Sequence, residues 1–346
     1  MNKIVFIINN HGNHNNIVFI INNHGNHNNI VHLGGGASEL LFFRTAFELS
    51  KYYNVSIINR DTPSIIDNIQ YLYLPDNFNI DIHDSIVIVQ RHFNIVVDLH
   101  KKYPSNKYIL WSHDYLENTF VHLTGNYSPK EIDALSQEAH IDIVAVSNFH
   151  KNNILSKLPN ANVHVIYNAL FGDLYVKNDA NVDYNNVVFA SNWAKGLNNV
   201  IKIGTECYRR NKNFKLLLLK PSYCEWEPVF SQPFIKIIGN IKDKNEYCKI
   251  LQNSLCVLST SYPETFGCVF AEALHLGVPV IGDNSINSGF HEIIQREHMC
   301  NFNNVNEVFG KIEEFRMNRP NVCLDNKFYD IAIIQEWVEI INTFNK

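Results

Sequence analysis

Residues Ser261–Gly282 read SYPETFGCVFAEALHLGVPVIG, and they carry the clearest indication of the fold of the chain. The apolar segment that precedes it, Leu255–Leu258, has the character of a buried strand. The pattern then predicts a helix over Cys268–Leu276, which ends at Gly277, and a second strand over Val278–Ile281. Strand, turn, helix and strand in this order are typical of a βαβ unit in a parallel sheet.

Two glutamates flank the predicted turn: Glu264 lies in the loop and Glu272 lies within the helix. Because ligands of parallel sheets bind beyond the carboxyl ends of the strands, both carboxylates can reach one crevice. The positive end of the helix and its first N–H groups suit a phosphate. These N–H groups belong to Phe266, Gly267, Cys268 and Val269. A carboxylate repels phosphate but accepts hydrogen bonds from sugar hydroxyls, so a sugar nucleotide satisfies both features.

The same residues resemble the E-x7-E signature of retaining glycosyltransferases, in particular family 4. The match comprises Glu264, Phe266-Gly267, Glu272-Ala273-Leu274, Gly277 and Pro279-Val280. A bare spacing of two glutamates would equally fit a solvated helix, but the flanking residues favour the signature. The resemblance implies the GT-B fold, an α/β architecture in which two Rossmann-like domains with doubly wound parallel sheets face a cleft. It also implies retention of the anomeric configuration, no metal requirement, Glu264 on the sugar hydroxyls and Glu272 on the ribose hydroxyls.

The composition indicates a globular protein with enough apolar residues for substantial cores. The chain has 346 residues, of which 46% are hydrophobic and 18% charged, and its net charge is −5. This charge, without a long basic run, argues against nucleic acid as a main partner. Seven cysteines without a CxxC motif favour a reduced, cytoplasmic chain. No segment approaches the ~20 apolar residues of a membrane span.

The N-terminal segment, residues 1–29, contains a perfect duplication: residues 4–16 recur as residues 17–29. We expect the second copy to supply the first strand, at Ile17–Ile21. The paired histidines of the HGNH motifs could suggest a metal site, but four histidines without nearby cysteine or carboxylate fit a polar low-complexity loop better. We therefore predict no metal site.

Residues 30–170 are predicted to form the N-terminal, acceptor-side domain. Its strands are expected at 55–59, 85–89, 107–111 and 143–146, as continuous apolar runs that are typical of buried parallel strands. The GGGASE stretch resembles the glycine loop of family 4, which implies that Gly35 and Gly36 contact the donor phosphates; Glu39 is offset and receives no role. Glycine at such a turn allows close approach of a ligand to the backbone.

Two polar positions follow the later strands of this domain. His113 stands where the family has a histidine that lies under the donor sugar and helps to stabilise positive charge. A purely structural histidine, capped by Asp114, is the equal alternative. Ser147 resembles a family motif that contacts phosphate, or it simply caps the helix that follows.

Residues 171–185 are polar and irregular and are predicted as a linker; residues 186–325 are predicted as the nucleotide-sugar-binding domain. The family resemblance places an arginine and a lysine at the diphosphate here. This chain keeps Lys195, and the arginine position falls within Ala190, Ser191 and Asn192. Ser191, Asn192 and helix N–H groups would then assist Lys195. The base would be held by backbone groups at Asn240 and Ile241.

The last segment, residues 326–346, is expected to form a helix that packs back on the N-terminal domain. Its apolar side comprises Ile331, Ile334, Trp337, Ile340 and Ile341. Amphipathic membrane binding is the alternative, although the helix has little basic character. The sequence therefore leaves peripheral membrane contact open, without a transmembrane segment.

Together these features predict an enzyme that moves a hexose from a nucleotide-diphosphate sugar to an unidentified glycan, lipid or protein acceptor. His113, Lys195 and Glu264 are the predicted catalytic residues, and no cofactor beyond the donor substrate is expected. A sugar-nucleotide epimerase and a catalytically degenerate sugar-nucleotide-binding protein remain alternatives, the latter because the arginine is missing. A dinucleotide oxidoreductase fits less well, since no G-x-G-x-x-G follows a strand.

Overall fold

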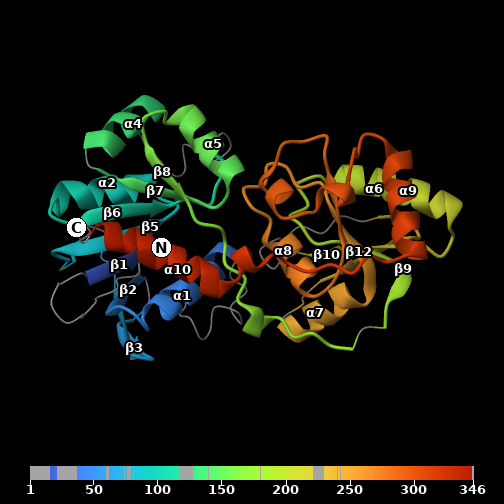
Figure 1. Cartoon of the computed structure of the whole chain (residues 1–346), viewed down its shortest axis with the longest axis horizontal. Helices are drawn as coiled ribbons and strands as arrows, with labels where there is room; N and C mark the ends of the chain where they lie inside the picture. The colour runs from blue at the N-terminus through green and yellow to red at the C-terminus, as the bar shows by residue number, and fades with distance from the viewer. Residues whose placement is uncertain are drawn as a thin grey trace. The chain divides into compact units, whose positions relative to one another are not determined.

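The computed structural model describes residues 16–21, 37–59, 62–73, 75, 79–80, 82–116, 128–138, 140–179, 181–220, 230–239, 241 and 243–344. The chain divides into two compact units (Figure 1). Unit 1 comprises Met1–Ala169 and Asp330–Lys346, and unit 2 comprises Leu170–Tyr329. Each unit is built on its own mainly parallel sheet with helical connections.

The described strands of unit 1 form one sheet in the order β3-β4-β2-β1-β5-β6-β7-β8. All neighbouring pairs are parallel except β3 with β4. The strands are β1 Asn16–Ile20, β2 Val55–Asn59, β3 Ser64–Ile66, β4 Ile69–Tyr73, β5 Ser85–Gln90, β6 Lys107–Trp111, β7 Asp142–Ala145 and β8 Asn162–Val165. The second copy of the duplication thus supplies all but the first residue of a central strand, as expected, and residues 4–15 of the first copy lie outside the described residues.

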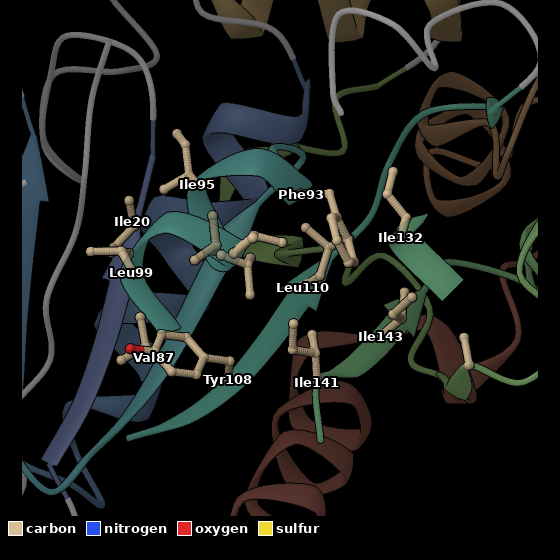
Figure 2. Close-up of a cluster of buried hydrophobic side chains, with 14 of the residues drawn as sticks. Ile20, Val87, Phe93, Ile95, Leu99, Tyr108, Leu110, Ile132, Ile141 and Ile143 are labelled. Atoms are coloured by element: carbon tan, nitrogen blue, oxygen red, sulfur yellow. The ribbon is translucent and has the colours of Figure 1, made fainter. Parts of the chain in front are cut away.

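The helices of unit 1 connect these strands and cover the sheet. Those within the described residues are α1 Ala37–Leu49, α2 Phe93–Lys102, α4 Pro129–Glu138, α5 Asn148–Lys157 and α10 Asp330–Thr343. Figure 2 shows one core cluster, where side chains of α2 such as Phe93 and Leu99 gather with strand residues such as Val87 and Leu110. Every residue of β5 is buried, which explains the continuous apolar run at residues 86–89.

A second core cluster fixes the C-terminal helix α10 to unit 1. Trp337 is fully buried and lies within 6.3 Å, between ring centroids, of Phe19 and Trp111. Phe42 of α1 stacks on Trp111 at 5.8 Å. Ile331, expected on the buried side of α10, is instead 83% exposed, because the helix begins at Asp330 and its phase turns Ile333 inward.

The described strands of unit 2 form a fully parallel sheet in the order β11-β10-β9-β12-β13-β14. The strands are β9 Asp183–Phe189, β10 Lys215–Leu219, β11 Ile235–Ile238, β12 Ser254–Ser259, β13 Val280–Asp283 and β14 Met299–Cys300. The helices that the structure describes here are α6 Leu197–Arg210, α7 Lys244–Gln252, α8 Cys268–His275 and α9 Val305–Met317, with short 3-10 turns η1 Gly172–Leu174, η2 Gly289–Glu292, η3 Arg296–His298 and η4 Asn326–Phe328. The predicted strand, turn, helix and strand of the opening stretch are therefore β12, the turn, α8 and β13.

The segment predicted as a linker, residues 171–185, carries ordered structure of its own. It contains η1 and the first residues of β9, and its neighbour Leu170 bonds through its N–H to the carbonyl of Phe328 at 2.7 Å. Phe171 is 2% exposed and Tyr175 is 6% exposed. These aromatic side chains tie the segment into unit 2.

Candidate functional site

The strand order of unit 2 reverses between β9 and β12. The chain proceeds from β9 outward to β10 and β11 and then returns to β12 on the other side of β9. In open parallel sheets such a switch point is where ligands bind, beyond the carboxyl ends of the two strands. Helices α6 and α8 both begin at this edge, because α6 follows β9 and α8 follows β12.

The loop between β9 and α6 lies directly on the loop after β12. Gly196 has φ of +96°, and a Cβ at this position would lie 2.4 Å from the carbonyl oxygen of Thr260. Asn192 shapes the preceding turn: its Oδ1 accepts from the N–H of Ala194 at 2.9 Å, and its carbonyl accepts from the N–H of Lys195 at 2.8 Å. Ser191 is 7% exposed in the same turn. This close approach brings Lys195 to the loop that carries Glu264.

Lys195 and Glu264, both predicted from the sequence, form an ion pair. Lys195 Nζ lies 3.1 Å from Glu264 Oε2, and the two side chains are 34% and 18% exposed. The backbone of Glu264 is also fixed, since its carbonyl accepts from the Gly289 N–H at 2.9 Å and from the Ser288 hydroxyl at 3.1 Å. The pair therefore offers a ligand two kinds of contact: the ammonium of Lys195 can bind an anionic group, and the carboxylate of Glu264 can accept hydrogen bonds from hydroxyl groups.

The first turn of α8 follows this pair in the same loop. Gly267 caps the helix with φ of +108°, Phe266 is 1% exposed, and Cys268 and Val269 are half-buried. The first N–H groups of a helix have no acceptor within the helix and carry the positive end of its dipole. The structure therefore brings Lys195, Glu264 and the predicted phosphate-binding turn together at the switch point.

Glu272 has a different environment from Glu264. It is 6% exposed, and its two carboxylate oxygens accept from the hydroxyls of Tyr175 and Tyr247, each at 2.5 Å. Lys244 Nζ lies 3.5 Å from Oε1. Burial raises the pKa of both tyrosines well above the usual range, and the nearby charge of Glu272 raises it further. The phenols are therefore neutral donors that hold the carboxylate.

In unit 1, His113 follows β6 and is 8% exposed. Burial, together with the charge of Arg91, lowers the pKa of His113 to about 3, so the imidazole is neutral at physiological pH. The ring of Trp111 lies 4.9 Å from that of His113, between centroids. The carboxylate of Asp114, expected in one reading to cap His113, is bound through both oxygens to Arg91, each at 2.7 Å.

Arg91 was not predicted from the sequence. It follows β5, has φ of +68°, and also lies 3.4 Å from Glu39, which is 6% exposed. The signal for it is a charged residue directly after an apolar strand that borders the switch point of unit 1, between β1 and β5. Ser147 caps α5 by accepting from the His150 N–H at 3.0 Å, which agrees with the capping alternative.

Three of the predicted contacts, Gly35, Gly36 and Asn240, lie outside the described residues, as do the four histidines of the HGNH motifs. Ile241 is half-buried before α7. Across the described part of the chain, no group of three or more His, Cys, Asp or Glu side chains is arranged to hold a metal ion. Nor does any helix there have the length and apolar character needed to cross a membrane.

A family model described as glycosyl transferases group 1 matches residues 231–325, within unit 2. A search of curated proteins finds no match to the chain. Among solved structures, TarM from S. aureus in complex with Fondaparinux, alpha-GlcNAc-glycerol and UDP is similar at 16% identity and a TM-score of 0.59, over 75% of this chain and 55% of that one. The present chain thus spans little more than half the length of TarM.

Two further solved structures are similar over most of their length. Sucrose-phosphate synthase from Thermosynechococcus elongatus has 14% identity and a TM-score of 0.56, over 75% of this chain and 73% of that one. HepE from Anabaena, in complex with UDP and glucose, has 14% identity and a TM-score of 0.52, over 75% and 78%. These similarities show the fold: the two parallel-sheet α/β units have the GT-B architecture that the sequence predicts.

Proposed function

We propose that the chain is a retaining glycosyltransferase, of family 4 type, that moves a hexose from a nucleotide-diphosphate sugar to a glycan, lipid or protein acceptor without a metal ion. The observation that carries this proposal is the Lys195–Glu264 ion pair beside the first turn of α8, at the switch point of unit 2. The group 1 match over residues 231–325, which include Glu264 and α8, supports it.

The chemistry of this site suits glycosyl transfer. The reaction passes through an oxocarbenium-like centre and releases a diphosphate. Lys195 and the N–H groups at the start of α8 would stabilise the charge that develops on the leaving diphosphate, which is a preorganised electrostatic effect. Glu264 would bind hydroxyls of the transferred sugar, and Glu272 would bind the ribose.

His113 is the catalytic residue that the proposal assigns to unit 1. Because its imidazole is neutral, it would not repel an oxocarbenium-like sugar and could offer a lone pair to its positive side. An acceptor hydroxyl would then attack on the face from which the diphosphate departs, which is the stereochemistry of retention. The family resemblance supports this placement.

A nucleotide-sugar-binding protein without turnover is the second candidate. It is favoured by one observation: the position where an arginine would share the diphosphate with Lys195 falls within Ala190, Ser191 and Asn192, and Asn192 Oδ1 is used in the turn. An epimerase would bind the same donor but would need no acceptor. Acceptor-dependent release of the nucleotide separates the three functions.

The test is a thermal-unfolding screen of the purified protein with UDP-, GDP-, ADP- and CMP-sugars in the presence of EDTA. UDP-sugars come first, because the TarM and HepE structures contain UDP. A bound donor raises the unfolding temperature by mass action, so we expect a shift with one nucleotide class. Folded protein that shows no shift with any donor would overturn the proposal.

A further inference from the structure

Lys244, at the start of α7, has an environment that the site described so far does not explain. Its Nζ lies 3.5 Å from Glu272 Oε1, and it lies over the rings of Tyr175 and Tyr247 at 4.3 and 4.7 Å from their centroids. Its side chain is 27% exposed, whereas that of Glu272 is 8% exposed. The ammonium group therefore lies next to a buried carboxylate and is itself partly accessible to solvent.

The buried carboxylate needs hydrogen-bond donors, and the two phenols already supply one to each oxygen. An ionised carboxylate offers about four lone-pair sites, and an ammonium carries three N–H donors. Acceptor capacity on Glu272 and donors on Lys244 thus remain for a ligand. The two tyrosine hydroxyls already satisfy the buried carboxylate of Glu272. Lys244 is a third partner, which is held by two aromatic rings and remains partly exposed, so its position is not explained by the burial of Glu272 alone.

A carboxylate beside an ammonium matches one ligand group closely. A hydroxyl both donates and accepts a hydrogen bond, so it can donate to Glu272 while it accepts from Lys244. A ligand that lacks this hydroxyl would lose both charge-assisted bonds and would leave both groups less well satisfied. The ribose of a nucleotide carries two such hydroxyls on adjacent carbons.

We propose that Lys244 is a specificity-determining residue that, together with Glu272, binds a ribose hydroxyl of the nucleotide, while Tyr175 and Tyr247 hold the carboxylate in place. The inference rests on the proposed donor site, to which it adds three residues. Lys244 follows closely on Ile241, where the base is expected, so one short segment would contact both the base and the ribose.

The test is isothermal titration calorimetry with UDP, GDP and ADP and with the 2′-deoxy and 3′-deoxy forms of whichever one binds. We expect the wild-type protein to prefer the ribonucleotide at least tenfold over one of the two deoxy forms, as two charge-assisted bonds require. Lys244→Met should lower this preference below about threefold, chiefly because the ribonucleotide binds more weakly to the variant. Lys244→Arg, which keeps the charge, should retain a preference.

Two further variants serve as a control and as a test of the tyrosine hydroxyl. Lys249→Met, an exposed lysine of the same helix, should bind as the wild type does. Tyr247→Phe keeps the ring under Lys244 and removes only the hydroxyl on Glu272, and it should also reduce the preference. A wild type without preference, or a Lys244→Met variant that keeps it, would overturn the inference and leave the donor site intact. If no nucleoside diphosphate binds the folded wild type, the proposed function fails with it.

Discussion

Lys195 and Glu264 form a hydrogen-bonded ion pair at 3.1 Å. Their proposed ligand groups differ: Lys195 would bind the diphosphate and Glu264 the hydroxyls of the sugar. A diphosphate would compete with the Glu264 carboxylate for the same ammonium. Because both side chains are partly exposed, the attraction between Lys195 and Glu264 is far weaker than the bare Coulomb energy at this distance, and a diphosphate can replace Glu264 as the partner of the ammonium. Binding of the donor would thus transfer Lys195 to the phosphates and leave Glu264 to the sugar.

Glu264→Gln tests this exchange. Because the amide removes the negative charge beside Lys195, we expect the variant to bind the free nucleoside diphosphate roughly three- to tenfold more tightly than the wild type. Sugar transfer should nevertheless fall about a hundredfold, as when one preorganised polar contact is lost. Calorimetry and a transfer assay give the two numbers. Weaker diphosphate binding, or undiminished transfer, would exclude this role for Glu264.

The sequence predicts Lys195, Glu264 and Glu272 from local patterns: the first two lie in loops between a strand and a helix, and Glu272 lies in the helix that follows. It did not identify Tyr175, whose hydroxyl meets Glu272 across 97 positions of the chain. Lys244 and Tyr247 were also missed, as was Arg91. Their roles depend on packing between separate elements, which leaves no periodic signal in one sequence.

Among the elements, the start of α6 determines where Lys195 lies. A helix N-cap with φ of +96° in contact with the Thr260 carbonyl admits only glycine without strain. The continuous apolar runs predicted β5, β6 and β12 well, since both faces of these strands are covered. The apparent linker was harder to interpret, because aromatic residues spaced irregularly, such as Phe171 and Tyr175, anchor it.

Gly196→Ala should therefore be costly in two ways. The left-handed backbone costs about 1–2 kcal/mol for an L-residue, and displacing the Thr260 carbonyl adds about 1–3 kcal/mol. Gly277→Ala is the matched control: its φ is +73°, and nothing lies within 4 Å of an added Cβ. Urea unfolding should show the larger loss for Gly196→Ala, with weaker nucleotide binding in that variant alone. Equal losses and unchanged binding would contradict the role of this contact.

At the level of the whole molecule, unit 1 contains a buried histidine whose tautomer is fixed by its neighbours. His150 Nδ1 accepts from the Val146 N–H at 3.3 Å, so Nε2 carries the proton and donates to the Asp114 carbonyl at 3.0 Å. Burial lowers the pKa of His150 to about 4, against opposing contributions from Asp114. Below about pH 6.5 the unfolded chain binds a proton that the folded unit does not.

Stability should therefore decrease as the pH falls from about 6.5 toward 4, by up to about 1.4 kcal/mol per pH unit for each such histidine. His150→Gln should reduce the loss of unfolding free energy between pH 7.5 and pH 5.5 by about 1 kcal/mol, measured by urea unfolding. His140→Asn, at an exposed turn position with φ of +47°, is the control and should keep the wild-type slope. An unchanged slope in His150→Gln would show that His150 is not the group responsible.

The resemblance carried by one stretch of sequence implied the two-unit α/β architecture, and the βαβ unit around α8 predicted a parallel sheet with a ligand edge. The central claim is that this edge binds the diphosphate of a sugar nucleotide through Lys195. The most direct measurement is calorimetric titration of wild type, Lys195→Met and Lys202→Met, an exposed lysine of α6, with the nucleotide that shifts the unfolding temperature. We predict that Lys195→Met weakens binding about 10- to 100-fold, as loss of a charge-assisted bond implies, and that Lys202→Met binds normally. Equal affinities of all three proteins would contradict the claim.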